Sequence, residues 1–496
     1  MNRVGGTPDG QQAPVGLHLA KVRVPLTGVL AAWLGRRLVA GGWWLIRHPL
    51  AVVAALVVLA MWRVTLTHGP LPALALCSVV TVALLVWRRL HPASFTALLA
   101  CRARGLWLAT TCYRYMWRPA MVTTGLAVRV DSTQYVPRLV SVRSTGSVDV
   151  VRVRMLPGQT ATDWAANAPR LAQTFGAIDC RVRSVPGRVH DLALWFLNSD
   201  PLTTPVLPFE PAVNCDGLDL AALPVGMGED GQVCRLRLLG AHLLVVGATG
   251  SGKGSVIWSL ITVLAPGIRD GLVQVWAVDP KGGMELAPGR ALFTRFVYGD
   301  PDAGGLYELD FAHVLEDAVF VMRRRQAALR GLTRLHTPTL AEPLIVVVID
   351  ELASLTAYVI DRDAKKRITA ALSLLLSQGR AVGVSVVGAV QDPRKDVVSM
   401  RDLFPTRILL RVTEPEHVAL TLGQGARDRG ARADVIDEAT PGVAYIGQDG
   451  VAEPIRVRFS HVTDTHITDL THRYSPRPTI ALAGIAASAT VQDVAS

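Results

Sequence analysis

Residues 243–254 read LLVVGATGSGKG, an apolar run followed by a glycine-rich turn and a lysine. The run Leu243–Val246 has the composition of a buried β-strand, and Gly254–Leu264 is typical of a helix. Strand, G-x-x-x-x-G-K turn and helix in this order form a P-loop, in which backbone N–H groups and the helix N-terminus bind phosphate. The residues expected to bind ATP are Gly247, Ala248, Thr249, Gly250, Ser251, Gly252, Lys253, Gly254 and Ser255, with Lys253 reaching the β- and γ-phosphates.

One position of this P-loop departs from the usual pattern. The residue after the lysine is ordinarily a Ser or Thr that ligates Mg²⁺, but here it is Gly254, and Ser255 follows one place later. A shift of one residue rotates a side chain by about 100° around a helix. Either Ser255 reaches the metal from a shifted loop, or a water fills that coordination position. Phosphate binding is expected to survive in both cases.

Two carboxylates follow a second apolar run, Leu344–Ile349. If this run is a strand beside the P-loop strand, Asp350 holds Mg²⁺ and Glu351 orients and polarises the attacking water. An apolar strand ending in Asp-Glu is weak evidence alone, but downstream of a P-loop it is strong. The two stretches together predict an ATPase that uses ATP and Mg²⁺.

Further short apolar runs alternate with segments long enough for helices. They occur at Leu272–Val278, Val384–Val390, Ile408–Val412 and Val443–Ile446. This alternation predicts an α/β fold with a parallel sheet covered by helices on both faces. We assign this P-loop domain to residues 234–463 and expect a C-terminal tail at 464–496.

A small α/β accessory domain is expected before the P-loop domain, at 139–233. Its predicted strands are Val148–Met155, Ile178–Val182 and Val189–Leu197. A helix with its N-cap at Thr162 or Asp163 is expected to reach Phe175 and stop at Gly176, with Pro169 kinking or shortening it. Prolines between 201 and 211 mark a boundary.

The N-terminal part has the pattern of a transmembrane helical hairpin at 43–90. The run Gly69–Trp87 is uncharged and long enough to span a bilayer, whereas Pro49–Trp62 spans only if it recruits its neighbours. Arginines flank the hairpin on both sides, so the positive-inside rule places both termini and the ATPase in the cytoplasm, with two spans in the cell membrane. The alternative is a buried hairpin of a soluble domain. Residues 1–42 are expected to be flexible, and 91–138 to be a linker or an interfacial segment.

The amino-acid composition bears on three questions: whether the chain folds, what kind of partner it binds, and whether it contains disulfides or zinc sites. Half of the residues are hydrophobic, which excludes a largely disordered chain. The 51 basic residues outnumber the 40 acidic ones, which gives a net charge of +11 and suits an anionic partner such as nucleic acid or lipid headgroups. Genomic codon bias is an equally good explanation of that excess. The six cysteines form no CxxC pair, so a disulfide scaffold or a zinc site is not expected.

Several further segments occur in a characteristic order. They are Asp279-Pro280-Lys281 with Glu285-Leu286, Met322–Arg325, Gly379–Gly383, Ala389–Pro393, Pro405–Ile408 and Pro441–Ala444. With the P-loop, this set resembles the FtsK/SpoIIIE family of DNA-pumping ATPases over roughly residues 235–462. The resemblance implies a RecA-like P-loop motor that assembles as a ring hexamer around double-stranded DNA.

The resemblance also implies roles for particular residues. Gln391 is similar to the glutamine that senses the γ-phosphate. Arg380 or Arg407 is a candidate arginine finger for a neighbouring subunit, with an interface salt bridge as the alternative for each. Arg394 and Lys395 lie in an expected pore loop, where they either contact DNA phosphates or are solvated loop charges. The arginines at 323–325 are expected to be structural or interfacial.

The expected domain content resembles the plasmid and integrative-element transfer translocases of high-GC Gram-positive bacteria. The leading hypothesis is a membrane-anchored, ATP-driven double-stranded DNA translocase that acts in conjugation. The tail is too short for a winged-helix DNA reader, so a separate DNA-recognition or transfer protein is an expected partner. The alternatives are a chromosome-segregation translocase at the division septum, a type VII-like protein-secretion ATPase, and an inactive scaffold that only Gly254 supports.

Overall fold

The computed structural model describes residues 49–300, 302, 307–451 and 453–476. The chain forms two units, one up to Thr96 and one from Ala97 onward, and each is described by itself. The expected flexible segment 1–42, residues 43–48 of the expected hairpin and residues 477–496 of the expected tail lie outside the described residues.

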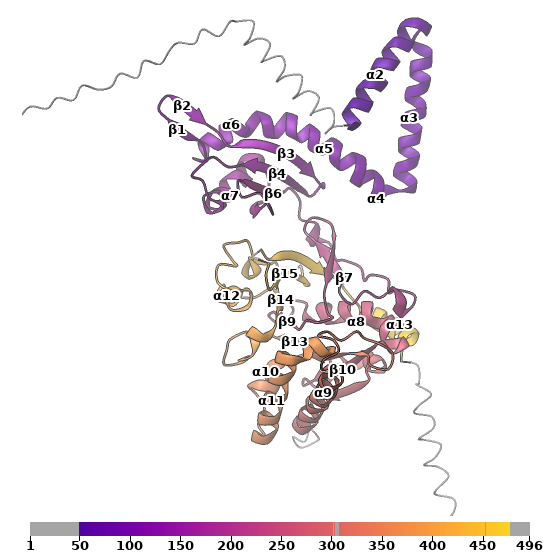
Figure 1. The fold of residues 1–496 in the computed structure, drawn as a ribbon, viewed down its shortest axis with the longest axis vertical. Coiled ribbons are helices and arrows are strands. Elements are labelled where there is room, and N and C mark those ends of the chain that lie inside the picture. Colours follow the sequence, from indigo (N-terminus) through magenta and orange to yellow (C-terminus); the bar gives the residue numbers. More distant parts are fainter. Residues whose placement is uncertain (1–48, 301, 303–306, 452, 477–496) are drawn as a thin grey trace, which may run out of the picture. The chain divides into compact units, whose positions relative to one another are not determined.

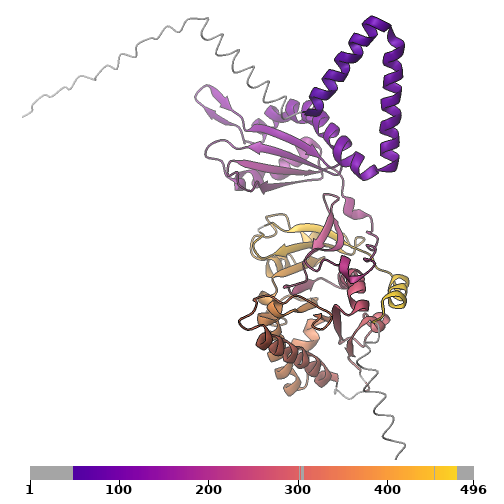
Figure 2. The same ribbon diagram turned by 45° about the vertical axis from the view of Figure 1, so that its right-hand side comes forward.

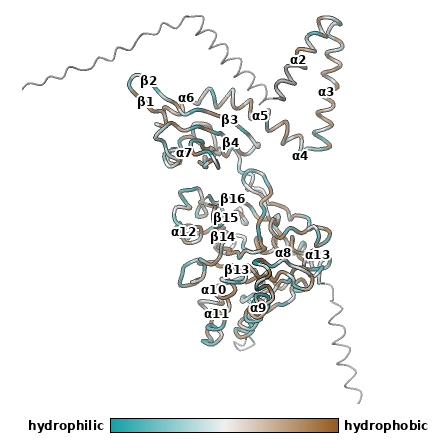
Figure 3. The backbone as a smooth tube through the Cα atoms, viewed as in Figure 1, coloured by the Kyte–Doolittle hydropathy of each residue, from teal (hydrophilic) through white to brown (hydrophobic). Residues whose placement is uncertain are grey.

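The first unit is helical. Its helices are α2 (Pro49–His68), α3 (Pro70–Leu90) and the short α4 (Pro92–Phe95), and α2 and α3 meet at Gly69, whose φ is 78° (Figure 1). Among the described residues, only α3 is long and apolar enough to cross a membrane. Its residues are largely hydrophobic (Figure 3), and most of its large apolar side chains are exposed. The structure thus supports one candidate membrane helix where the sequence predicts two.

The second unit begins with a helical run that leads into a small sheet. The run contains α5 (Cys101–Leu108) and α6 (Arg114–Thr123), with π-helical turns η1 (Thr96–Ala100) before α5 and η2 (Ala109–Tyr113) between them. A hairpin, β1 (Val128–Val130) and β2 (Thr133–Tyr135), follows. The antiparallel sheet has the order β3-β4-β6-β5 and consists of β3 (Arg138–Ser144), β4 (Val148–Arg154), β5 (Asp179–Ser184) and β6 (Asp191–Leu197), with α7 (Ala161–Phe175) between β4 and β5.

Residues 101–123 are part of this accessory domain and not the linker that the sequence suggests. The aromatic side chains of Trp117, Trp164 and Phe196 are buried in one core with Tyr113. Gly105 lets α5 lie close on β3, because a Cβ there would sit 3.1 Å from a backbone oxygen of β3. Side chains from a helical face and from the sheet therefore bury one another, a pairing that the sequence pattern does not show.

Helix α7 confirms the expected end and corrects the expected start. Thr160 is the N-cap and forms a capping box with Asp163, so the cap lies two residues before Thr162. Gly176 ends the helix in the left-handed conformation with φ 70°, as predicted. Pro169 lies inside the helix, which nevertheless continues to Phe175.

The domain expected to be the motor, called the motor below, is built on a ten-stranded sheet with the order β11-β10-β12-β13-β9-β14-β15-β16-β7-β8. The strands are β7 (Leu223–Gly228), β8 (Val233–Leu236), β9 (Leu243–Val246), β10 (Val273–Asp279), β11 (Arg295–Tyr298), β12 (Leu344–Ile349), β13 (Val384–Val390), β14 (Thr406–Leu410), β15 (Val443–Gln448) and β16 (Ile455–Phe459). From β11 to β14 the pairing is parallel, and from β14 to β8 it is antiparallel.

The mixed sheet corrects the all-parallel sheet that the sequence predicts. Strand β15 starts beside the P-loop, where Gly442 N donates to Ser251 O at 2.9 Å, and so it begins at the edge where the parallel strands end. It therefore runs antiparallel to β14. Strands β7 and β8 also belong to this sheet, which moves the start of the motor fold to before residue 234.

Helices cover both faces of the sheet. They are α8 (Lys253–Asp270), α9 (Tyr307–Leu329), α10 (Leu352–Thr356), α11 (Arg362–Gln378), α12 (Glu416–Leu422) and α13 (Asp464–Tyr474). Alternation along β9 puts Leu244 and Val246 in the core with α9 and α11, which lie side by side (Figures 1 and 2). Leu243 and Val245 join the core with α8.

Helix α13 corrects the expected tail over its first residues. Ile467, Leu470 and Tyr474 are buried in the α8 core. The helix buries only one narrow apolar stripe, which is why its sequence looks polar. Short 3₁₀ turns complete the unit: η3 (Pro201–Thr203), η4 (Cys215–Gly217), η5 (Ala287–Leu292), η7 (Gly379–Val382), η8 (Arg401–Leu403) and η9 (Ala433–Val435).

Candidate nucleotide-binding and hydrolysis site

The P-loop lies at the carboxyl end of β9, between β13 and β14 in the sheet, and leads directly into α8. Gly252 has φ 97°, and a Cβ there would sit 2.4 Å from the backbone nitrogen of Gly442. Only glycine fits this conformation and this approach. The loop and the N-terminus of α8 therefore present a close-packed backbone cradle of the kind that binds phosphate.

Lys253 is the first residue of α8. Its Nζ donates hydrogen bonds to two loop carbonyl oxygens, at 2.9 Å to Gly247 and 3.1 Å to Ala248. Burial lowers the pKa of Lys253, and the carboxylates of Glu351 and Asp350 oppose that effect. The amine is held over the loop by contacts that phosphate oxygens are able to replace.

Asp350 and Glu351 lie beside the P-loop, as the sequence predicts. They follow β12, and their side chains are buried, with residue exposures of 5% and 4%. Lys281 joins them: its Nζ is 3.1 Å from Glu351 Oε2 and 3.6 Å from Asp350 Oδ2. Burial raises the pKa of Asp350, and Lys281 opposes that rise.

Gln391 connects the P-loop with Glu351. Its Oε1 accepts a hydrogen bond from Thr249 Oγ1 at 3.0 Å, and its Nε2 donates to Glu351 Oε2 at 3.2 Å. The amide thus touches both the loop expected to bind phosphate and the carboxylate expected to act on water.

The residues present fit ATP and Mg²⁺. Ser251 Oγ and Glu351 Oε1 are buried and have no hydrogen-bond partner among the described residues, so both are available to a bound group. No cluster of three or more His, Cys, Asp or Glu able to hold a metal occurs within the described part of the chain. That is compatible with Mg²⁺, which uses one or two carboxylates together with phosphate oxygens and water.

Gly254 and Ser255 face different neighbours. A Cβ at Gly254 would sit 2.0 Å from Glu285 Oε1. Ser255 instead lies near Gly442, in the loop before β15. A Cβ built on Gly442 would be 3.9 Å from Ser255 Oγ. Burial raises the pKa of the Glu285 carboxyl group, and Asp350 and Asp279 raise it further.

Arg380 and Arg407 do not lie at this chain's own P-loop. They precede or begin β13 and β14, whereas the P-loop follows the carboxyl end of the parallel strand β9, so they occupy the opposite edge of the sheet. Arg407 donates to Phe404 O at 3.0 Å and to Thr421 O at 3.3 Å. The side chain of Arg380 is exposed and makes no hydrogen bond or ion pair within the described part of the chain.

Arg394 and Lys395 lie in the loop after Gln391. Arg394 donates to Glu414 at 2.8 Å, and Lys395 is 3.8 Å from Asp402. Both side chains are more than half exposed. Ion pairs this exposed contribute little, so both cations are free to exchange partners with phosphate.

Two further arginines donate hydrogen bonds to backbone carbonyl groups, Arg325 in the protein interior and Arg411 beside the P-loop. Arg325 is buried and donates to Val382 O, Gly383 O and Pro343 O, so this member of the 323–325 group is structural, as expected. Arg411, which sequence reasoning missed, lies next to the P-loop and donates to Thr249 O at 3.2 Å. No local signal marks it, because it reaches the loop through the β9–β14 pairing.

Comparison with known proteins gives a family match that includes the P-loop. The model of the FtsK/SpoIIIE family matches residues 216–333, which contain the P-loop, Lys281 and Glu285. Residues 216–333 thus match the FtsK/SpoIIIE family. The expected family resemblance is therefore confirmed.

Two curated relatives differ in how much of their length the chain covers. The transfer protein TraSA of Streptomyces ambofaciens is 27% identical over 376 residues, covering 73% of this chain and 87% of TraSA. The DNA translocase FtsK of Chlorobaculum tepidum is 29% identical over 187 residues, and the chain spans only 22% of its length. Among solved structures, the pCW3 conjugation coupling protein TcpA is 19% identical with a TM-score of 0.41, over 72% of this chain and 98% of TcpA.

Proposed function

We propose that the chain is a membrane-anchored ATPase that moves double-stranded DNA between cells in conjugative transfer. The bridge from Thr249 through Gln391 to Glu351 is the observation that carries the ATPase part. The match of residues 216–333 to the FtsK/SpoIIIE family supports DNA as the polymer. Coverage of nearly all of TraSA, against a small part of FtsK, favours transfer over chromosome segregation.

Each residue of the site has a definite task in this proposal. The P-loop backbone and Lys253 bind the β- and γ-phosphates. Mg²⁺ bound with ATP supplies charge neutralisation at the phosphates, with Asp350 holding it. Glu351 Oε1, which has no partner among the described residues, accepts a proton from the attacking water, while Gln391 and Lys281 hold Oε2.

Assembly completes the site in this proposal. Arg380 is exposed at the edge of the sheet away from its own P-loop, which suits an arginine finger that serves a neighbouring subunit of a hexamer. Arg407 is a weaker candidate, because backbone carbonyl groups already occupy its guanidinium. Arg394 and Lys395 are proposed to contact DNA phosphates, and a separate transfer protein is proposed to select the DNA.

The test is ATP hydrolysis by the full chain in lipid nanodiscs, without DNA and with double-stranded or single-stranded DNA. We expect duplex DNA to stimulate hydrolysis and the stimulation to fall as salt rises, because phosphate contacts release counterions. Arg380→Ala is expected to keep nucleotide binding and lose the stimulation. Glu351→Gln is expected to bind nucleotide and lose at least about 100-fold in rate, since it removes the general base.

Lys253→Ala is the control that removes phosphate binding. Hydrolysis that is equal with and without duplex DNA, in wild-type chain shown to form rings, would contradict the proposal. Stimulation by an unfolded polypeptide in place of DNA would move the assignment to protein secretion.

A further inference from the structure

Glu285 occupies the space beside the P-loop residue that departs from the usual pattern. Gly254 is the second residue of α8, and a Cβ there would lie 2.0 Å from Glu285 Oε1 and 3.1 Å from its Cδ. A serine or threonine at 254 therefore does not fit while Glu285 keeps this position. The Glu285 carboxylate thus fills the space that a side chain at position 254 would need.

The backbone around Glu285 is fixed by Asp279, which is fully buried at the end of β10. Asp279 Oδ2 accepts hydrogen bonds from the backbone nitrogens of Glu285 at 3.1 Å and Leu286 at 3.0 Å. Its Oδ1 accepts from Lys281 N at 3.2 Å. One buried carboxylate thus shapes the turn that carries both Lys281 toward Glu351 and Glu285 toward α8.

The same corner of the sheet contains the other groups expected to face the metal. Strand β10 pairs with β12, Val278 opposite Ile349, so the residues after the two strands are neighbours. Lys281 lies within 3.6 Å of Asp350. Two buried oxygens of the site, Ser251 Oγ and Glu351 Oε1, have no partner among the described residues, which points to a bound group between the P-loop and β12.

We propose that Glu285 supplies the protein oxygen toward Mg²⁺ that a P-loop hydroxyl ordinarily supplies, and that Gly254 makes room for it. Carboxylate oxygen is a hard ligand that suits Mg²⁺ at least as well as a hydroxyl. Ser255 does not take this role, because it lies against the loop at Gly442. The inference rests on the proposed binding of ATP with Mg²⁺, and not on DNA translocation.

The test is a cycle of four full-length chains: wild type, Glu285→Ala, Gly254→Ser and the double variant Gly254→Ser/Glu285→Ala. Mn²⁺ affinity in the presence of ADP is measured by electron paramagnetic resonance, and binding of a fluorescent ADP is measured in EDTA. We expect each single variant to lose about tenfold or more in Mn²⁺ affinity, as loss of a metal-site partner does. The double variant is expected to recover most of it, because a hydroxyl then fits beside a small side chain.

Ser255→Ala is the matched control and is expected to bind Mn²⁺ like wild type. Equal binding of fluorescent ADP in EDTA by all five proteins shows that the P-loop is intact. Wild-type Mn²⁺ affinity in Glu285→Ala, or a loss in Ser255→Ala that matches it, overturns the assignment to Glu285. Failure of the wild type to bind any nucleotide overturns the proposed ATPase and this inference together, whereas absence of DNA stimulation counts only against the proposed DNA translocation.

Discussion

At the scale of single residues, His242 links stability to pH. Its ring is fully buried just before β9, and Nδ1 accepts a hydrogen bond from Val386 N at 3.0 Å. Nε2 is buried without a partner among the described residues. Burial, and secondarily the charge of Arg380, lowers the pKa of His242 to about 3.

We predict that the motor loses stability as pH falls below about 6.5, the pKa of an exposed histidine. Between that pH and about 3 the unfolded chain binds a proton that the folded chain does not, so the free energy of unfolding falls by up to about 1.4 kcal/mol per pH unit. His242→Asn keeps an acceptor for Val386 N and removes the titration. Thermal unfolding at pH 7 and pH 5 should therefore change less in the variant. Equal changes in both proteins would contradict the prediction.

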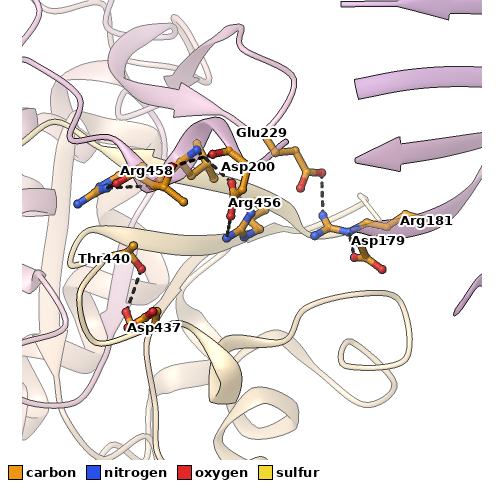
Figure 4. Close-up of polar contacts among 10 residues, drawn as sticks. Asp179, Arg181, Asp200, Glu229, Asp437, Thr440, Arg456 and Arg458 are labelled. Carbon is orange, nitrogen blue, oxygen red and sulfur yellow. Dashed lines mark hydrogen bonds and ion pairs between the residues drawn. The ribbon is translucent and has the colours of Figure 1, made fainter. Parts of the chain in front are cut away.

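At the scale of elements, a buried ion-pair network joins the accessory sheet to the motor sheet. Arg181 of β5 contacts Glu229 Oε1 at 2.7 Å (Figure 4), and Glu229 follows β7. Arg183 of the same strand contacts the same oxygen at 3.3 Å. Arg456 of β16 donates to Asp200 at 2.7 Å. Burial raises the pKa of Glu229, which the two arginines oppose. The network orients β5 on the β7–β8 hairpin.

We predict that Glu229→Gln destabilises this junction by about 3 kcal/mol, because Arg181 and Arg183 lose the buried carboxylate they share and keep only the longer contacts to Asp179 at 3.4 Å and Glu453 at 3.5 Å. Replacing Glu229 together with its closer partner, Arg181→Met with Glu229→Met, is expected to cost less than the single change, because Arg183 keeps Glu453 at 3.5 Å. The measurement is thermal unfolding together with the rate of limited proteolysis between residues 198 and 222. Glu210→Gln, a change at an exposed glutamate of that segment, is the control. A smaller loss in Glu229→Gln than in the double variant would argue against an ion-pair junction.

At the scale of the whole molecule, the proposed anchoring depends on α3. The helix exposes apolar side chains along its length and carries its arginines, Arg88 and Arg89, in the last turn. Apolar residues followed by cations suit a span with a cytoplasmic end. Helix α2 contains Arg63 within its sequence, so it spans only as the partner of α3 in the proposed two-span hairpin.

We predict that the full chain stays in the membrane pellet after alkaline carbonate extraction. Val80→Arg with Leu84→Arg, both near the middle of α3, should release it, because a central arginine costs about 2.5–3.5 kcal/mol. Leu90→Arg, at the end of α3, is the control and should leave the chain in the pellet. Retention of the double variant would show that α3 is not the anchor.

The sequence predicted those parts of the site that short-range patterns encode. The P-loop, Asp350 with Glu351, and Gln391 each lie directly after an apolar strand, and in a parallel sheet such ends share one edge. The structure brings Thr249, Gln391 and Glu351 into contact in this way. Most strands of the motor were predictable for the same reason, because a buried parallel strand is a continuous apolar run.

Other features depend on which segments pack together, and only the tertiary structure decided them. The direction of β15, the inclusion of β7 and β8 in the motor sheet, and the packing of α13 follow from pairing between distant segments. The contact of Glu285 with Gly254 arises in the same way, since Asp279 fixes the turn after β10 against α8. The amino-acid sequence by itself indicated the local strands, loops and helices, because these depend mainly on interactions between residues that are close along the chain. Its long-range contacts depend on the sum of all packing interactions, which no single segment contains.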